Sequence, residues 1–373
     1  MSGSSLAERR LSNPFVLLIA TSVAMLVIGL VMILSASSVE AFQRYGSSFM
    51  FFNRQVLGTL VGVAVMLVLA RTDHRKLRRF AGPAMVISVA LLAAVLIPGV
   101  GVTRGGSSRW LVFGPITLQP SELTKLTVLV FTAHVLDRKG KKILDFKELM
   151  LPVFAVLGLV CLLIMAQPDL GTTLITALAV MVVVFLAGAR TKHLVALFGS
   201  GLMMTLALIM GEGYRRARLF SYLNPWSDPL NTGYQTIQGQ IALGSGGLFG
   251  LGLGASRQKW SYVPNAHTDF IFAILGEELG LVGTMATLLL FVFFIYLGVR
   301  IARKAPDRFG YLVAGGITGW IGIQALINMG AVTGILPITG VPLPLISFGG
   351  SSLVFTMAAI GILLSIARSR KSS

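Results

Sequence analysis

The sequence has 373 residues, of which 55% are hydrophobic and only 12% are charged. This composition excludes an ordinary soluble domain and predicts a protein whose solvent is lipid. The formal net charge of +17 could favour a nucleic-acid partner, but the basic residues lie in short clusters between apolar segments. They therefore indicate membrane topology, and no nucleic-acid partner is expected.

The first apolar segment, 14–36, follows Arg9 and Arg10 as the core of a signal peptide would. It is longer than the roughly 7–15 residues of such a core, so we interpret it as a retained first helix. Further segments long enough to cross about 30 Å of hydrocarbon lie at 52–70, 80–97, 118–136, 150–167, 170–188, 193–211, 267–299, 310–332 and 347–367. We expect an all-α polytopic membrane protein with about ten transmembrane helices. Its single cysteine, Cys161, lies within a span and excludes an intramolecular disulfide.

The loops on the two sides of these spans differ in basic charge. Of the 31 Lys and Arg residues, 21 lie on the side of the N-terminus and 9 on the other side, while Lys125 lies inside a span. Because basic loops stay in the cytoplasm, both termini are predicted to be cytoplasmic. We expect a tail at 1–13, one membrane domain at 14–367 and a second tail at 368–373.

The longest irregular segments all lie on the predicted outer side. They are the loops near 98–118 and 212–264 and a shorter one near 333–346, and they are rich in Gly and Pro. The 212–264 loop holds five basic and two acidic residues, which suits an anionic lipid head. Long loops confined to one face are where we expect a functional site.

The fourth span opens with polar residues. Glu122 and Lys125 are three residues apart, so they share one helix face and could form an ion pair. An unpaired Lys125 within the membrane would cost at least about 2.5–3.5 kcal/mol. Two interpretations remain open: a structural ion pair that holds helices together, and a cation that lines a polar cavity open to the outside.

The eighth span also begins with ionisable residues. Asp269 is expected in its first helical turn, where a carboxylate could simply stabilise the helix N-terminus. Glu277 lies eight residues further on and would share the face of Asp269, with Glu278 beside it. Carboxylates that continue into a span require a polar lining, which favours a functional site.

Other polar residues within spans suggest contacts between helices. Gln167 and Asp169 lie at a helix junction, and Gln324 and Asn328 are four apart in the ninth span, so interhelical hydrogen bonds are expected. His267 has no partner at metal-ligand spacing, and no metal site is predicted.

Several groups of residues, in order along nearly the whole chain, resemble the signatures of the SEDS family (shape, elongation, division and sporulation). They are Gly106–Trp110, Gln119–Glu122, Gln167–Gly171, Ala266–Phe272, Glu277–Gly280, Pro342–Leu345 and Gly349–Ser352. Their co-occurrence is specific, whereas any one of them alone is not.

The resemblance implies a fold of ten helices and a glycosyltransferase that acts on lipid II beside a class B penicillin-binding protein. Asp269 is then the essential carboxylate. Supporting site residues are Arg109, Trp110, Glu122 and Lys125, joined by Lys259 of the outer loop and Glu277 as further substrate-binding candidates. The family often has Glu where this chain has Asn265, which weakens any acid role at that position.

Within the family, Asn224–Pro229 and Ser256–Trp260 look more like the FtsW division branch than the RodA elongation branch. A division protein would work at the septum with other divisome membrane proteins. It would also bind the nascent glycan strand.

The implied reaction joins a sugar hydroxyl to C1 of a donor sugar and displaces a lipid pyrophosphate. It needs a base, which Asp269 could supply, and positive charge, which Arg109, Lys125 or basic residues of the outer loop could supply. No cofactor is evident. A divalent cation (Mg²⁺ or Mn²⁺) could contribute to charge stabilisation, although the sequence shows no recognisable set of metal ligands. A lipid II flippase and a non-catalytic scaffold that activates the penicillin-binding protein remain the alternatives.

Overall fold

The computed structural model describes residues 13–104, 107–114, 116–211, 213–260, 263–264 and 266–369. Each expected span coincides with a helix. These helices are α2 (Pro14–Tyr45), α3 (Met50–Arg71), α4 (Leu77–Val95), α5 (Pro120–Lys139), α7 (Ala155–Met165), α8 (Leu170–Leu186), α9 (Thr191–Gly211), α12 (Ile271–Arg303), α13 (Arg308–Thr333) and α14 (Gly350–Arg368). Seven of the helices found in these ranges are long and apolar enough to cross a membrane, so the chain is a multi-pass membrane protein.

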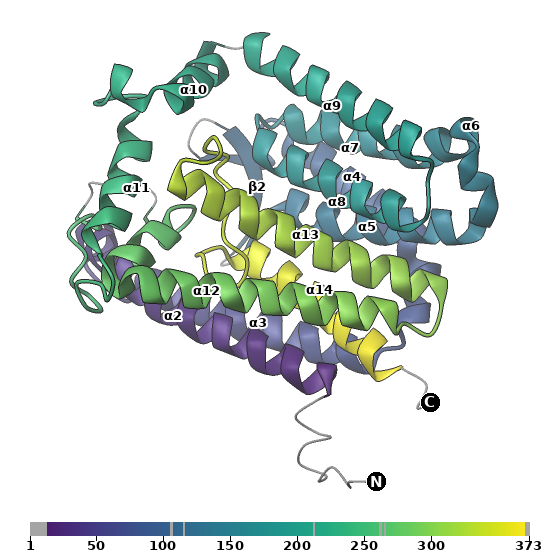
Figure 1. The fold of residues 1–373 in the computed structure, drawn as a ribbon, viewed down its shortest axis with the longest axis horizontal. Coiled ribbons are helices and arrows are strands. Elements are labelled where there is room, and N and C mark those ends of the chain that lie inside the picture. Colours follow the sequence, from purple (N-terminus) through teal and green to yellow (C-terminus); the bar gives the residue numbers. More distant parts are fainter. Residues whose placement is uncertain are drawn as a thin grey trace, which may run out of the picture.

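The helices form a bundle around α13 and α14, which are the most buried of the long helices (Figure 1). α12 packs along α13, α3 packs along α14, and α4 packs along α5. Small residues allow this close approach. A Cβ on Gly298 of α12 would collide with Thr318 of α13, and one on Gly316 would lie 2.6 Å from Val183 of α8.

Shorter elements close the two ends of the bundle. At one end, on the left of Figure 1, lie α11 (Tyr234–Ser245), η4 (Pro225–Ser227) and α10 (Gly213–Leu223). At the other end lie α6 (Phe146–Leu149) with η2 (Gly140–Leu144) and η3 (Met150–Phe154), while η1 (His74–Lys76) precedes α4. The 212–264 loop is thus partly helical, which its sequence does not predict.

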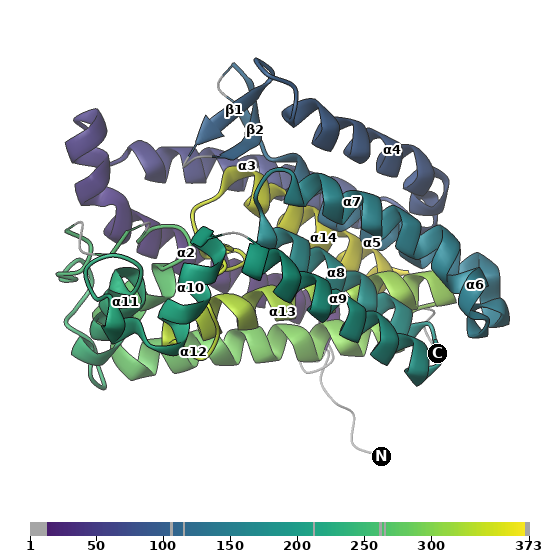
Figure 2. The ribbon, with the colours of Figure 1, turned by 90° about the horizontal axis from the view of Figure 1, so that it is seen from above.

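A small antiparallel sheet follows α4 in the chain and lies at one end of that helix (Figure 2). Its strands, in the order β1-β2-β3, are β1 (Gly101–Arg104), β2 (Ser107–Phe113) and β3 (Ile116–Leu118). Leu111 in β2 lies opposite both Gly101 and Leu118, and its side chain is buried. The expected 98–118 loop therefore contains ordered strands, which present Arg109 and Trp110 at fixed positions.

α12 is kinked at Gly280. This residue has φ 66° and ψ −162°, a conformation that side chains strongly disfavour. A turn formed by residues 246–254 packs into the kink, and a Cβ on Gly280 would collide with Gly250 N and lie 2.5 Å from Leu248 O. The kink thus allows the 212–264 loop to approach the backbone of α12.

Gly280→Ala is expected to lower the free energy of unfolding by at least about 2 kcal/mol, because backbone strain and a backbone collision add. Thermal unfolding of the purified protein measures this effect. Gly158→Ala in α7 is the matched control, since a Cβ at Gly158 meets nothing within 4 Å. Equal unfolding temperatures for the two variants would contradict the strain assigned to Gly280.

Candidate functional site

Asp269 lies outside the helix in which it was expected. α12 begins at Ile271, with Phe270 at its N-cap and no acidic residue in its first turn. The Asp269 carbonyl accepts a hydrogen bond from Asn328 Nδ2 at 2.8 Å, whereas the first helical amides bond to the Phe270 carbonyl. The placement of Asp269 in the first helical turn is therefore wrong, and the residue sits on a turn held by a side chain of α13.

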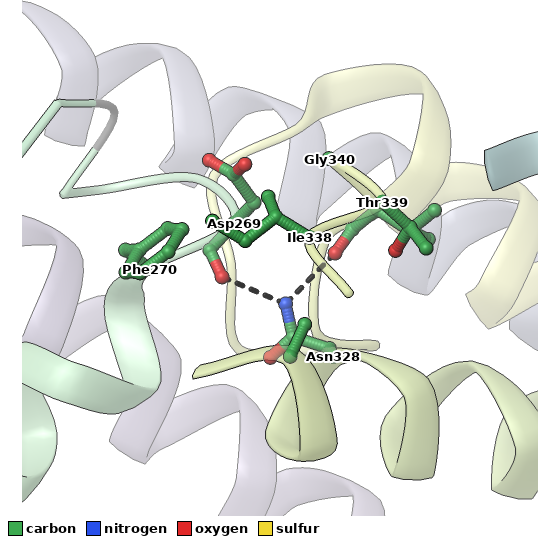
Figure 3. Close-up of a pocket in the computed structure, with 8 residues that line it drawn as sticks. Asp269, Phe270, Asn328, Ile338, Thr339 and Gly340 are labelled. Carbon is green, nitrogen blue, oxygen red and sulfur yellow. Dashed lines mark hydrogen bonds between the residues drawn. The ribbon is translucent and has the colours of Figure 1, made fainter. Parts of the chain in front are cut away.

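Asn328 joins this turn to the loop that follows α13. Its Nδ2 also donates to the Val341 carbonyl at 2.8 Å. Figure 3 shows the Asp269 carboxylate pointing away from Asn328, on the far side of the backbone that Asn328 holds. Thr268 Oγ1 donates to Asp269 Oδ1 at 2.9 Å. The backbone is thus fixed from one side while the half-buried carboxylate extends from the other.

A small pocket lies beside Asp269, with an empty volume of about 160 Å³. Phe270 and Asn328 line it together with residues 338–341 of the loop after α13. Gly340 lies beside the carboxylate, because a Cβ there would lie 3.9 Å from Asp269 Oδ2. A recess this small does not enclose a ligand, so a large substrate would have to lie across it.

The turn that carries Asp269 is anchored at His267 as well. The His267 carbonyl accepts from the Phe348 amide at 2.9 Å, and its ring packs against the rings of Phe51 and Phe348. His267 Nδ1 lies 3.1 Å from Glu40 Oε2 at the end of α2. Glu40 was not among the predicted site residues, because it precedes His267 by more than 200 positions and only the fold brings them together.

The predicted ion pair is present on α5. Lys125 Nζ lies 2.9 Å from Glu122 Oε1, and both side chains are buried. Lys125 also donates to Gln324 Oε1 at 3.0 Å, and its Nζ lies 5.1 Å from the centre of the Trp320 ring. Because Lys125 has no exposed surface, it does not line a cavity open to the outside in this structure.

Gln324 connects this ion pair to the loop beside Asp269. Its Nε2 donates to the Pro342 carbonyl at 2.9 Å, and its Oε1 accepts from both Lys125 and Trp320. Gln324 and Asn328 are one turn apart on α13 and hold successive carbonyls of the same loop. Polar contacts therefore run from Glu122 to the loop at Pro342, and from the neighbouring Val341 through Asn328 to the backbone of Asp269.

The 334–349 loop is held by several other helices. Gln55 of α3 donates to the Ser347 carbonyl and accepts from the Gly349 amide, both at 3.3 Å. Cβ atoms on Gly29 and Gly171 would collide with this loop, so both glycines are needed for its close approach to α2 and α8. The wall of the pocket is thus rigid.

Arg109 and Trp110 lie on β2, beside the junction of α7 and α8. The Arg109 guanidinium donates to the carbonyls of Gln167 and Pro168, at 3.0 and 2.5 Å, and lies 3.5 Å from Asp169. The Trp110 side chain is half-buried. Arg109 therefore ties the sheet to the helix junction and has about a third of its side chain exposed for other contacts.

Glu277, Glu278 and Lys259 form a separate cluster. Glu277 accepts from the hydroxyl of Ser256 and from the amide of Arg257, and Glu278 accepts from Ser35 of α2 at 2.6 Å. Lys259 Nζ lies 3.6 Å from Glu278 Oε1 and donates to the Gly254 carbonyl.

The grouping of Glu277 with Asp269 on one helix face is wrong, because Asp269 is not in the helix. Glu277 and Lys259 are both buried, and their contacts hold the 212–264 loop against α12. They are not gathered around the pocket beside Asp269.

Asp228 also lies in the 212–264 loop, apart from this cluster. The Thr232 amide and the side chains of Asn231 and Thr232 hold the pKa of the Asp228 carboxyl below its usual value. Among the described residues, no group of three or more His, Cys, Asp or Glu side chains could hold a metal ion. Asn265 lies outside the described residues.

These features define a multi-pass membrane protein with a carboxylate on a rigid turn at one end of its bundle. The family model described as "Cell cycle protein", which unites FtsW, RodA and SpoVE, matches residues 15–372. The chain therefore belongs to the SEDS family of cell cycle proteins.

Individual relatives agree with this assignment. The chain is 45% identical to the stage V sporulation protein E of Bacillus subtilis over 96% of its own length and 98% of that protein. It is 43% identical to a Geobacter sulfurreducens protein named "Probable peptidoglycan glycosyltransferase FtsW", over 94% of each chain.

Solved structures share the fold. A chain from a peptidoglycan synthase complex, described as coordinating polymerization and crosslinking, is 32% identical with a TM-score of 0.80, over 95% of this chain and 98% of that one. The rod shape determining protein RodA of Thermus thermophilus is 30% identical with a TM-score of 0.71, over 95% of this chain and 97% of that one.

Proposed function

We propose that this chain is a peptidoglycan glycosyltransferase that polymerises lipid II at the outer face of the bacterial cytoplasmic membrane, with Asp269 as general base. The activity is supported by the names of its relatives. The observation that carries the assignment of Asp269 is its half-buried carboxylate on a turn whose backbone is fixed by Asn328. A base must be held at one place relative to the reacting hydroxyl, and this turn does that.

The proposed topology has ten membrane-crossing helices, with both termini in the cytoplasm. Residues 14–367 then form one membrane domain between the tails 1–13 and 368–373. The three helices beyond the seven long apolar ones are α5, α7 and α8, of which α7 and α8 are apolar but shorter. The end of the bundle that carries Asp269, α10 and α11 faces outward.

A cysteine at Ser227 is expected to react with a membrane-impermeant maleimide added to intact cells, and one at Ser372 is expected to react only after lysis. Cys161, the single native cysteine, is first replaced by alanine. The reverse labelling pattern would put the Asp269 turn in the cytoplasm and exclude an outer-face polymerase.

In the proposed reaction, the acceptor's 4-hydroxyl oxygen bonds to C1 of the donor sugar while the bond from C1 to the pyrophosphate oxygen breaks, with inversion. Asp269 takes the hydroxyl proton. The lipid pyrophosphate is a stable leaving group and needs cations rather than an acid. Lys125 is buried and bound to Glu122 and Gln324, so we assign it to positioning the loop beside Asp269 rather than to contact with substrate.

The substrate-binding surface is proposed to extend over the sheet and the outer loop. Trp110 could stack on a sugar, and the exposed part of Arg109 could bind phosphate. Arg54 and Arg257 are exposed as well and supply further positive charge on the outward end of the bundle. Glu277 and Lys259 support this surface by holding the outer loop in place.

The proposed partner is a class B penicillin-binding protein, which would crosslink the strands. The similar chain from a peptidoglycan synthase complex supports this pairing. We further propose a division role at the septum with other divisome proteins. The similarity to stage V sporulation protein E favours a second candidate, the same reaction during sporulation.

The decisive experiment uses the purified chain with its partner, whose transpeptidase serine is replaced, and purified lipid II. Glycan strands resolved on a gel are the expected product. A flippase would move lipid II across vesicles without making polymer. A scaffold would give no polymer with a partner that lacks a glycosyltransferase domain, so absence of strands from a folded complex would refute the proposal.

A further inference from the structure

The turn formed by residues 246–254 leaves large apolar side chains uncovered. Leu248, Phe249 and Leu253 are 62%, 80% and 60% exposed. Exposed apolar residues this close together usually mark an interaction surface rather than water-facing surface. Something apolar is therefore expected to cover this turn.

The turn is not a loose loop, because its backbone is bonded to α12 on both sides of Gly280. The amides of Leu281 and Val282 donate to the carbonyls of Gly247 and Leu248, at 2.9 and 3.1 Å. In return, the Leu251 amide donates to the Glu277 carbonyl at 2.9 Å. These hydrogen bonds fix the position of the turn along the axis of α12, beside the kink at Gly280.

The length of α12 relates that position to the membrane. The two parts of α12 on either side of the kink have 33 residues in all, or about 50 Å along the helix path, which exceeds the roughly 30 Å of hydrocarbon. Arg300 and Arg303 in its last turn mark the cytoplasmic boundary in the proposed topology. About 20 residues cross the hydrocarbon, and counting them back from Arg300 leads to Gly280.

Exposed side chains on either side of the kink fit this boundary. On the membrane side of Gly280, α12 exposes apolar residues that include Leu281, Val282, Met285 and Leu289. On the other side, the Arg257 amide binds the Glu277 carboxylate, and Arg257 and Trp260 are both exposed. Tryptophan and arginine are typical of the interface between lipid and water.

We propose that the 246–254 turn is an interfacial anchor that inserts Leu248 and Phe249 into the outer leaflet, with lipid acyl chains as its occupant. Lipid is the expected occupant because Leu248 and Phe249 extend the exposed apolar face that α12 presents to the membrane. The inference rests on the proposed orientation of the chain.

The anchor would set the height of the catalytic turn. The helix from Ile271 to Gly280 covers roughly 14 Å, and the two residues before it add at most about 7 Å, so Asp269 stands no further than about 21 Å above the hydrocarbon. The headgroup layer on each side is roughly 5–7 Å thick. A sugar linked to its lipid through a pyrophosphate projects beyond that layer, toward the level of Asp269.

The test places a nitroxide spin label at single cysteines in the full chain carrying Cys161→Ala, reconstituted in phospholipid vesicles. The labelled variants are Phe249→Cys and Leu253→Cys in the turn, with Leu289→Cys as the lipid control and Ser227→Cys as the aqueous control. Collisions with oxygen, which concentrates in lipid, are compared with collisions with a water-soluble nickel chelate.

We expect the ratio of oxygen to nickel collisions at residue 249 to lie clearly above that at 227 and below that at 289, which is deeper in the hydrocarbon. Residue 253 should lie between 249 and 227. A ratio at 249 equal to that at 227 would overturn the anchor. Loss of both kinds of collision at 249 would also overturn it, because protein would then cover the turn. None of these outcomes depends on glycan synthesis, and the maleimide experiment tests the orientation separately.

Discussion

The Asp269→Asn variant is expected to fold and to bind its partner while glycan synthesis from lipid II falls by about 10²–10⁴-fold, the range typical of losing a general base. Asparagine has nearly the size of aspartate. The backbone contacts of the turn also remain, because Asn328 binds the carbonyl of residue 269 and not its side chain. The substitution therefore removes a proton acceptor with little change in shape. Gel-resolved glycan from purified lipid II measures the effect.

Two controls separate chemistry from folding. A melting curve and a partner pull-down show whether the Asn variant retains its structure. Thr268→Val removes the hydroxyl that donates to Asp269 Oδ1 but leaves the carboxylate, so only a modest loss of activity is expected. Near-normal glycan synthesis by a folded Asp269→Asn variant would show that Asp269 is not the base.

The helices could be predicted from the sequence because apolar length is a local signal. All ten expected spans coincide with helices, with boundaries that shift by a few residues at most ends. The largest difference is at α2, which continues from the predicted end at 36 to Tyr45. The end of an apolar segment marks where a helix leaves the lipid, but the backbone hydrogen bonds of the helix can continue beyond it. The predicted span therefore did not include the last turns of α2, which carry Glu40.

The site was only partly predictable for a related reason. Glu122 and Lys125 are three apart on one helix, so their pairing followed from helix geometry. Asp269 and Glu277 were grouped by the same geometry, but this failed because the helix starts later than its apolar pattern suggests.

Tertiary contacts that sequence spacing does not encode were missed altogether. Glu40 reaches His267 from α2, and the 334–349 loop forms the wall of the pocket. Polar residues within a span, such as Gln324 and Asn328, are the local signal that could have pointed to this wall. Each binds a carbonyl of the loop.

Lys125→Met should both destabilise the protein and reduce glycan synthesis. The substitution leaves the buried Glu122 carboxylate without its cation, and Glu122 Oε2 already has no hydrogen-bond partner in this structure. Breaking a buried pair in this way costs about 3–5 kcal/mol. Gln324 would also lose a charged donor, which loosens its hold on the Pro342 carbonyl beside the Asp269 pocket. Thermal unfolding and the glycan assay measure the two effects.

The double variant Glu122→Gln, Lys125→Met separates stability from positioning. It contains no uncompensated buried charge, so its unfolding temperature should return close to that of the original protein. Glycan synthesis should remain at least about tenfold below that of the original protein, because Gln324 still lacks the ammonium that orients it. Gln324 holds the same 334–349 loop to which Asn328 connects the Asp269 turn. The comparison must be made at equal folded concentration, so that stability cannot account for the difference. Recovery of both properties in the double variant would show that the ion pair only holds α5 in place, and the polar chain from Glu122 to Asp269 would then have no part in the reaction.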